Sequence, residues 1–225
     1  MSVFYATPYG GYSISSSQGT NNIKRIYDYL HSHGYSKQCI IGICGNIVAE
    51  SSLNPWLWEN NTVNYSKGYG LLQFTPASEY INDTGVPNHA PNLSTSAQTQ
   101  GADPDDALGQ LYCLITDRFG KWVGNCWRFY WDRSEYPTLS TLSQHCLDTY
   151  GNGSTITMTQ FKGVDNFEDA CFIFLACYEG PLVPNYYQRL TYCRQVKSIL
   201  DNYGSLQDIL FLKRFIIDRQ NDTLT

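Results

Sequence analysis

The strongest constraint on the fold is a nearly continuous apolar stretch over residues 39–49, in which Asn46 is the only polar residue. At 100° per residue, the stretch divides into a broad apolar arc and an opposite face of small residues. The arc contains Ile40, Ile43, Cys44, Ile47 and Val48, and the small face contains Gly42, Gly45 and Ala49. A helix with these two faces packs on both sides. We therefore expect a buried central helix over residues 37–52, capped by Ser36 and closed before Pro55.

A carboxylate, Glu50, stands near the end of this expected helix. Its direction lies within about 20° of that of Ile43, at the edge of the apolar arc. Partial burial and the negative end of the helix dipole both disfavour a charged side chain. We therefore expect a raised pKa for Glu50, which would let it protonate a leaving group near neutral pH. The alternative is a glutamate that turns outward into solvent.

The rest of the chain predicts one mainly helical domain. Hydrophobic periodicity favours further helices over residues 22–31, 76–82, 103–119, 141–150, 167–178, 185–202 and 206–218. Glycine, asparagine and aromatic residues over 56–74 favour a small β-hairpin lobe. The predicted fold class is α+β, mainly α. We expect an extended N-terminal arm at 1–20, the domain itself at 21–204, and a helical tail at 205–225 that serves as an assembly contact.

Charge and composition exclude several classes of protein. The net charge is −5, which argues against a nucleic-acid binder, because such proteins usually neutralise phosphates with a basic surface. No apolar run reaches the length of a membrane span, and residues 1–17 do not have the composition of a secretory signal. The eight cysteines show no C-x-x-C spacing, so we expect buried thiols, with disulfides as the alternative. His145 and Cys146 alone are too few for zinc, so we expect no metal or cofactor.

Three motifs follow one another in a fixed order. They read GNIVAESSLNP at 45–55, GYGLLQFTPASEYI at 68–81 and FLACYEGP at 174–181. In this order they resemble the phage tail lysozyme family of the lysozyme superfamily. The resemblance covers residues 21–82 and 167–200, whereas residues 83–165 match no family motif. It implies a lysozyme-like fold, in which a buried central helix ends in the catalytic glutamate beside a small β-hairpin lobe.

The resemblance also implies roles for individual residues. Glu50 matches the family's catalytic acid, which protonates the glycosidic oxygen after N-acetylmuramic acid. Ser51 matches a position that contacts the sugar or supports the acid. Gln73, in the turn bordered by Gly68 and Gly70, would bond sugar N-acetyl or hydroxyl groups. Tyr178 matches a tyrosine whose hydroxyl lies near the acid.

Three further residues have two interpretations each. Trp58 and Tyr69 would stack on sugar rings, or pack in the core. Glu59 is the nearest candidate for a second catalytic carboxylate, or it is only a surface residue. Without an assured base, the sequence leaves open whether the glycan strand is hydrolysed or cleaved by transglycosylation.

The function that these motifs predict is a muramidase acting on the glycan strands of peptidoglycan. An acidic protein gains no attraction to an anionic wall, whereas attachment to a particle supplies a high local concentration. We therefore expect a virion enzyme of a phage tail, with other tail proteins as partners. The alternatives are a lytic transglycosylase, a Cys-His peptidase, and a non-catalytic wall-binding or structural tail protein.

Overall fold

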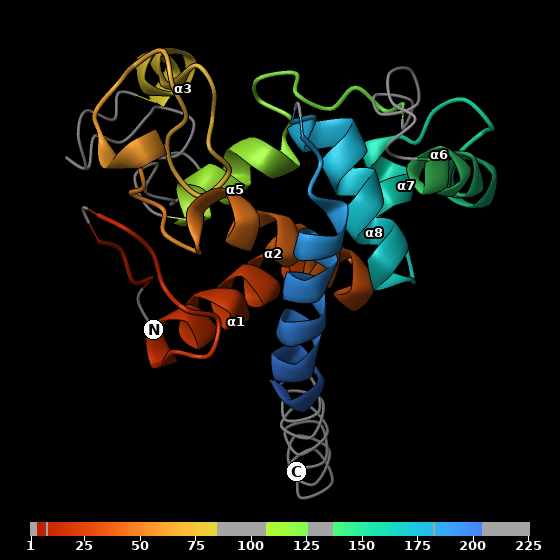
Figure 1. Ribbon diagram of the computed structural model, residues 1–225, viewed down its shortest axis with the longest axis horizontal. Coiled ribbons are helices and arrows are strands. Elements are labelled where there is room, and N and C mark those ends of the chain that lie inside the picture. The colour runs from red at the N-terminus through yellow and green to blue at the C-terminus, as the bar shows by residue number, and fades with distance from the viewer. Residues whose placement is uncertain (1–3, 8, 85–106, 126–136, 182, 204–225) are drawn as a thin grey trace, which may run out of the picture.

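The computed structural model describes residues 4–7, 9–84, 107–125, 137–181 and 183–203, and this part of the chain is mainly helical (Figure 1). The α-helices are α1 Ser17–Ser32, α2 Lys37–Ser51, α3 Ala77–Thr84, α5 Ala107–Ile115, α6 Pro137–Tyr150, α7 Met158–Lys162 and α8 Phe167–Phe174. The π-helical turn η3 Leu175–Glu179 extends α8, the 3-10 turn η1 is Glu59–Asn61, and a last helix occupies residues 186–203. The predicted predominance of helix is confirmed.

Helix α2 lies at the centre of the described helices (Figure 1). Every residue from 39 to 48 is buried. At its N-terminus the Ser36 hydroxyl accepts a hydrogen bond from the Cys39 amide at 3.0 Å and donates to the Val164 carbonyl. At its C-terminus Ser52 adopts a left-handed conformation with φ of 48°. The ends of α2 thus lie within one residue of the helix expected from the sequence.

The small face of α2 brings it close to two other helices. A Cβ atom on Gly42 would lie 2.6 Å from the backbone of Ala170 and Cys171 in α8. A Cβ atom on Gly45 would lie 2.1 Å from the Cys193 sulfur in the helix at 186–203. Real Cβ atoms do not approach other atoms so closely, so these glycines permit the packing that positions α2.

The segment between α2 and α3 is built from turns. Two isolated antiparallel bridges pair Trp58 with Tyr69 and Tyr69 with Phe74, and the described residues contain no longer strand. Backbone hydrogen bonds join Glu59 to Gly68 at 2.9 Å and Gly70 to Leu57 at 2.8 Å. The region therefore has the antiparallel pairing of the expected hairpin only at single residue pairs.

Several boundaries differ from the predicted ones. Helix α1 begins at Ser17, inside the expected extended arm, because the Ser16 side chain caps it by accepting from the Gly19 amide. Helix α5 ends at Ile115, ahead of the expected residue 119, and Asp117 follows with a left-handed φ of 46°. Helix α7 was not expected, although Thr157 and Gln160 form a complete capping box at its start. The expected tail at 205–225, with its helix at 206–218, lies outside the described residues.

The N-terminal segment packs against the start of the domain. The Asn22 side chain bonds both the amide and the carbonyl of Tyr5 at 2.9 Å, and Asn54 donates to the carbonyls of Thr7 and Gly10. Phe4 is buried. This N-terminal segment is therefore held against the domain.

The cysteines of the described chain are buried thiols, at positions 39, 44, 113, 146, 171, 177 and 193. This confirms the sequence interpretation for those positions, and Cys126 lies outside the described residues. Burial raises the pKa of the Cys39 and Cys44 thiols. Both thiols therefore stay protonated and are poor nucleophiles, which weakens the peptidase alternative. Of the helices in the described ranges, none has the length and apolar character needed to cross a bilayer.

Candidate active site

A pocket of about 350 Å³ opens beside the C-terminal end of α2. It is bordered by the last turn of α2, the turns at 59–75, the segment after α5, and η3. The residues that line it are Glu50, Glu59, Leu72, Gln73, Phe74, Thr75, Lys121, Tyr178, Glu179 and Pro181. The pocket thus gathers residues from all three sequence motifs, including four of the seven predicted site residues.

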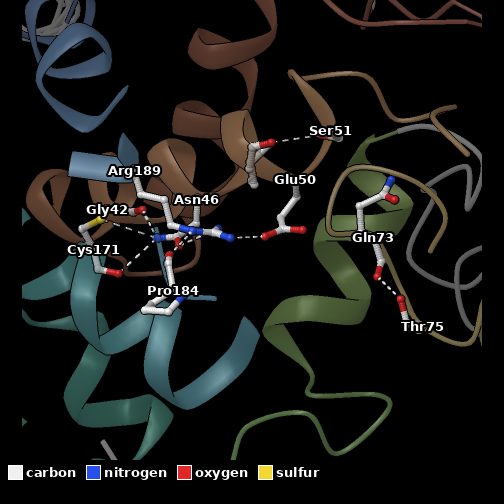
Figure 2. A network of polar contacts seen from close by, with 10 residues as sticks. Gly42, Asn46, Glu50, Ser51, Gln73, Thr75, Cys171, Pro184 and Arg189 are labelled. Carbon is white, nitrogen blue, oxygen red and sulfur yellow. Dashed lines mark hydrogen bonds and ion pairs between the residues drawn. The ribbon is translucent and has the colours of Figure 1, made fainter. Parts of the chain in front are cut away.

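Glu50 is partly buried at this pocket and forms an ion pair with Arg189 (Figure 2). Its side chain is 20% exposed, and its Oε1 accepts a hydrogen bond from Arg189 Nη2 at 2.5 Å. The Arg189 side chain is only 6% exposed. A guanidinium at this distance stabilises the ionised carboxylate, which opposes the burial and the helix dipole considered from sequence.

The same arginine is bound by two further acceptors. Arg189 Nη1 donates to Asn46 Oδ1 at 3.1 Å, and Nε donates to the Pro184 carbonyl at 3.1 Å. Asn46 in turn donates to the carbonyls of Gly42 at 2.9 Å and Cys171 at 3.1 Å. The single polar residue of the apolar stretch therefore links α2 to α8 and orients the cation that pairs with Glu50.

Gln73 lines the same pocket, and its amide is held by the turn that carries it. Its Nε2 donates to the carbonyls of Leu57 at 3.1 Å and Gly70 at 2.9 Å. A Cβ atom on Gly68 would lie 2.6 Å from Gln73 Oε1. The glycine in the second motif therefore leaves room for the glutamine amide.

Tyr178 belongs to η3 and lines the pocket with an almost buried side chain. Its ring stacks on Phe174 with centroids 4.9 Å apart. Burial, and then the neighbouring charge of Glu179, raise the pKa of Tyr178 well above its usual range. Its hydroxyl consequently stays protonated and can donate a hydrogen bond.

Two more carboxylates and a lysine face the pocket. Glu59 Oε2 accepts from the Gly68 amide at 3.0 Å, and Glu59 Oε1 lies 3.8 Å from Lys67 Nζ. Glu179 follows Tyr178 in η3. Lys121 donates to the Thr75 carbonyl at 2.8 Å. Together with Glu50, the pocket thus has three carboxylates and one ammonium group along its wall.

Three predicted site residues lie away from the pocket lining. Ser51 is fully buried, and its hydroxyl donates to the Ile47 carbonyl at 3.1 Å. Trp58 and Tyr69 are 2% and 0% exposed, and their rings pack with centroids 4.6 Å apart. These two rings form the centre of the turn region, so the structure supports the core-packing interpretation and leaves them no open face for a sugar.

Arg189 and Lys121 are site residues that the sequence reasoning missed. A signal for Arg189 was present, because it shares a helix face with the buried residues Tyr186 and Cys193. A cation on an apolar face predicts a buried anionic partner elsewhere. Lys121 lies in a segment without periodicity or motif, and no sequence pattern pointed to it. In the described ranges, no cluster of three or more histidine, cysteine or acidic side chains could hold a metal ion.

The mainly helical fold is consistent with the lysozyme-like class that the motifs resemble. Residues 21–200 match the family model of the phage tail lysozyme, and the chain therefore belongs to this family. The match also includes residues 83–165, where no motif was found. One curated relative is Morphogenesis protein 1 of Bacillus phage B103, which is 28% identical over 196 residues.

That alignment covers 85% of this chain and 42% of the relative, so the chain spans less than half of that protein. The family and the relative together support a phage-associated, lysozyme-like protein of the virion.

Proposed function

We propose that this protein cleaves the glycan strand of peptidoglycan as a muramidase, with Glu50 as the general acid. The observation that carries the proposal is the shared pocket: Glu50 is half-sheltered there, and Gln73 and Tyr178 line the same pocket. A sheltered carboxyl group beside neutral hydrogen-bonding side chains suits a polar, uncharged sugar. Ser51, Trp58 and Tyr69 support this site from the core.

In the proposed reaction, Glu50 gives its proton to the glycosidic oxygen while the bond from that oxygen to the anomeric carbon breaks. The bonding electrons stay with the oxygen, and positive charge develops on the sugar ring. Gln73 Nε2 is already used by two backbone carbonyls, so Oε1 is the amide atom that would accept from an N-acetyl group. The protonated Tyr178 hydroxyl would donate to the sugar near the acid.

The second carboxylate decides between two outcomes. Glu59 lines the pocket and is our candidate for the base that activates water. Its carboxylate is, however, already bonded to the Gly68 amide and lies near Lys67. This engagement favours a lytic transglycosylase as the second candidate, because that reaction uses the sugar's own hydroxyl and needs no second carboxylate.

We further propose that the enzyme is carried in a phage tail and opens the host wall during genome delivery. The family and the morphogenesis protein support this location, and the net charge of −5 fits an enzyme delivered by a particle. In this proposal residues 21–204 form the catalytic domain, and the tail at 205–225 contacts other tail proteins. Absence of the protein from purified particles would contradict the location.

The test of the activity compares wild type with Glu50→Gln on purified cell walls. Glu168→Gln is the matched control, because Glu168 also forms an ion pair with an arginine, at 3.1 Å, but lies outside the pocket. We expect new reducing or anhydro ends from wild type and the control, and none from Glu50→Gln. Equal cleavage by all three proteins, or release of new amines without new glycan ends, would overturn the proposal.

A further inference from the structure

We infer that Arg189 is a positioning residue for Glu50: it selects the carboxyl oxygen that carries the proton and stabilises the carboxylate left after proton transfer. The inference rests on the proposed function, because it concerns how the same acid works. The ion pair joins the last helix of the described chain to the end of α2 (Figure 2).

The geometry of Arg189 is fixed from several directions. Its Nε donates to the Pro184 carbonyl, its Nη1 to Asn46 and its Nη2 to Glu50. A planar guanidinium held at three nitrogens has little freedom to rotate. The residue is 5% exposed, so water does not replace these contacts. Arg189 therefore presents one N–H group to Glu50 in a set direction.

This contact distinguishes the two oxygens of Glu50. Oε1 accepts from Arg189, whereas no hydrogen bond from the described residues reaches Oε2. In Figure 2 the second oxygen points away from Arg189, on the side of Gln73. A proton on Oε1 would face the N–H donors of Arg189, so the proton of the acid form belongs on Oε2. Arg189 thereby directs the acidic oxygen toward the pocket.

Arg189 also offsets the negative charges that surround Glu50. Glu59 from η1 and Glu179 from η3 line the same pocket and disfavour further negative charge, as does the C-terminus of α2. Tyr178 is neutral, and Lys121 donates to the Thr75 carbonyl and lies 3.7 Å from Glu79 Oε2. Arg189 is the buried cation in direct contact with Glu50 and offsets these effects.

The offset matters in the proton transfer itself. The proton leaves Oε2 for the glycosidic oxygen, the bond to the anomeric carbon breaks toward that oxygen, and Glu50 becomes a carboxylate. Water, or the sugar's own hydroxyl, then adds to the anomeric carbon and returns a proton to Glu50. Because negative charge develops on Glu50, a fixed cation at Oε1 stabilises the transition state more than the ground state.

The test is the pH profile of wall cleavage by wild type, Arg189→Met and Arg189→Lys. Arg194→Met is the matched control, since Arg194 lies on the same helix and pairs with Glu168 in a solvent-exposed ion pair. We expect Arg189→Met to lower kcat about 100-fold with little change in KM, and to move the alkaline limb of the pH profile to higher pH. Arg189→Lys should recover part of both effects, and Arg194→Met should match wild type.

A second measurement does not depend on activity. The carboxyl carbons of glutamate are labelled with ¹³C, and the Glu50 signal is assigned by its loss in Glu50→Gln. We expect this signal to titrate at higher pH in Arg189→Met than in wild type, with near-ultraviolet circular dichroism confirming the fold of each variant. Unchanged titration and an unchanged pH profile overturn the inference. If the Glu50 signal titrates differently in wild type and Arg189→Met, but wild type cleaves no glycan, the proposed function is overturned instead.

Discussion

The packing of α2 against α8 predicts a specific cost for Gly42→Ala. The added Cβ would lie 2.6 Å from backbone atoms of Ala170 and Cys171, and backbone atoms cannot rotate away as a flexible side chain can. Overpacking of a core costs about 1–3 kcal/mol. Because the clash is with backbone atoms, we take a cost of about 3 kcal/mol for Gly42→Ala. Alanine regains about 1 kcal/mol through its higher helix propensity. The expected net loss in the free energy of unfolding is therefore about 2 kcal/mol.

The assay is urea unfolding of Gly42→Ala and wild type at neutral pH, with equal m-values as the check on a common mechanism. Gly163→Ala is the control, because Gly163 caps α7 with φ of −90° and its added Cβ would meet only one atom, at an ordinary 3.7 Å. The control should be neutral or slightly stabilised. A Gly42→Ala variant as stable as wild type would refute the close approach of α2 and α8.

Two further perturbations test the turn and the last helix. Gly68→Ala should displace the Gln73 amide, since its Cβ would lie 2.6 Å from Oε1, and should reduce wall cleavage about tenfold while the thermal midpoint changes little. Wild-type activity in this variant would show that the amide position is unimportant. Hydrogen bonds from Lys197 and Lys37 lower the pKa of Asp201. Its ionised form therefore stabilises the fold above the ordinary aspartate pKa of about 4, and this contribution is lost as the pH falls further. Asp201→Asn should melt slightly below wild type at pH 7, and the difference should shrink as the pH falls through the lowered pKa of Asp201; a difference that does not shrink on acidification would exclude the ion pairs as its cause.

The parts of the fold that follow from sequence are those with a local physical signal. The apolar stretch at 39–49 is interpreted as a helix, and Ser36 marks its start. The limits of α2 were therefore predicted within one residue. Asn166 marks the start of α8 in the same way, by accepting two amide hydrogen bonds. Caps and periodicity are short-range properties, and a single sequence carries them in full.

The starts of α1 and α7 carry local caps that were not used in the prediction. The other parts that did not follow depend on contacts between distant residues. Trp58 and Tyr69 have the same aromatic character on a sugar-binding surface as in a core, and only the packing of the turn region shows that they are buried. The ion pair between Glu50 and Arg189 joins residues 139 positions apart. The prediction for Glu50 used only the residues of its own helix. It therefore included burial and the helix dipole, but not the ion pair with Arg189.

The most direct test of the account is mass spectrometry of peptidoglycan fragments released by wild type and Glu50→Gln from the same purified wall. Wild type should release short glycans ending in N-acetylmuramic acid, with either a reducing or a 1,6-anhydro end, and Glu50→Gln should release none. The form of that end also separates hydrolysis from transglycosylation. Intact glycan strands with cut stem peptides, or the same glycan fragments from both proteins, would contradict the account.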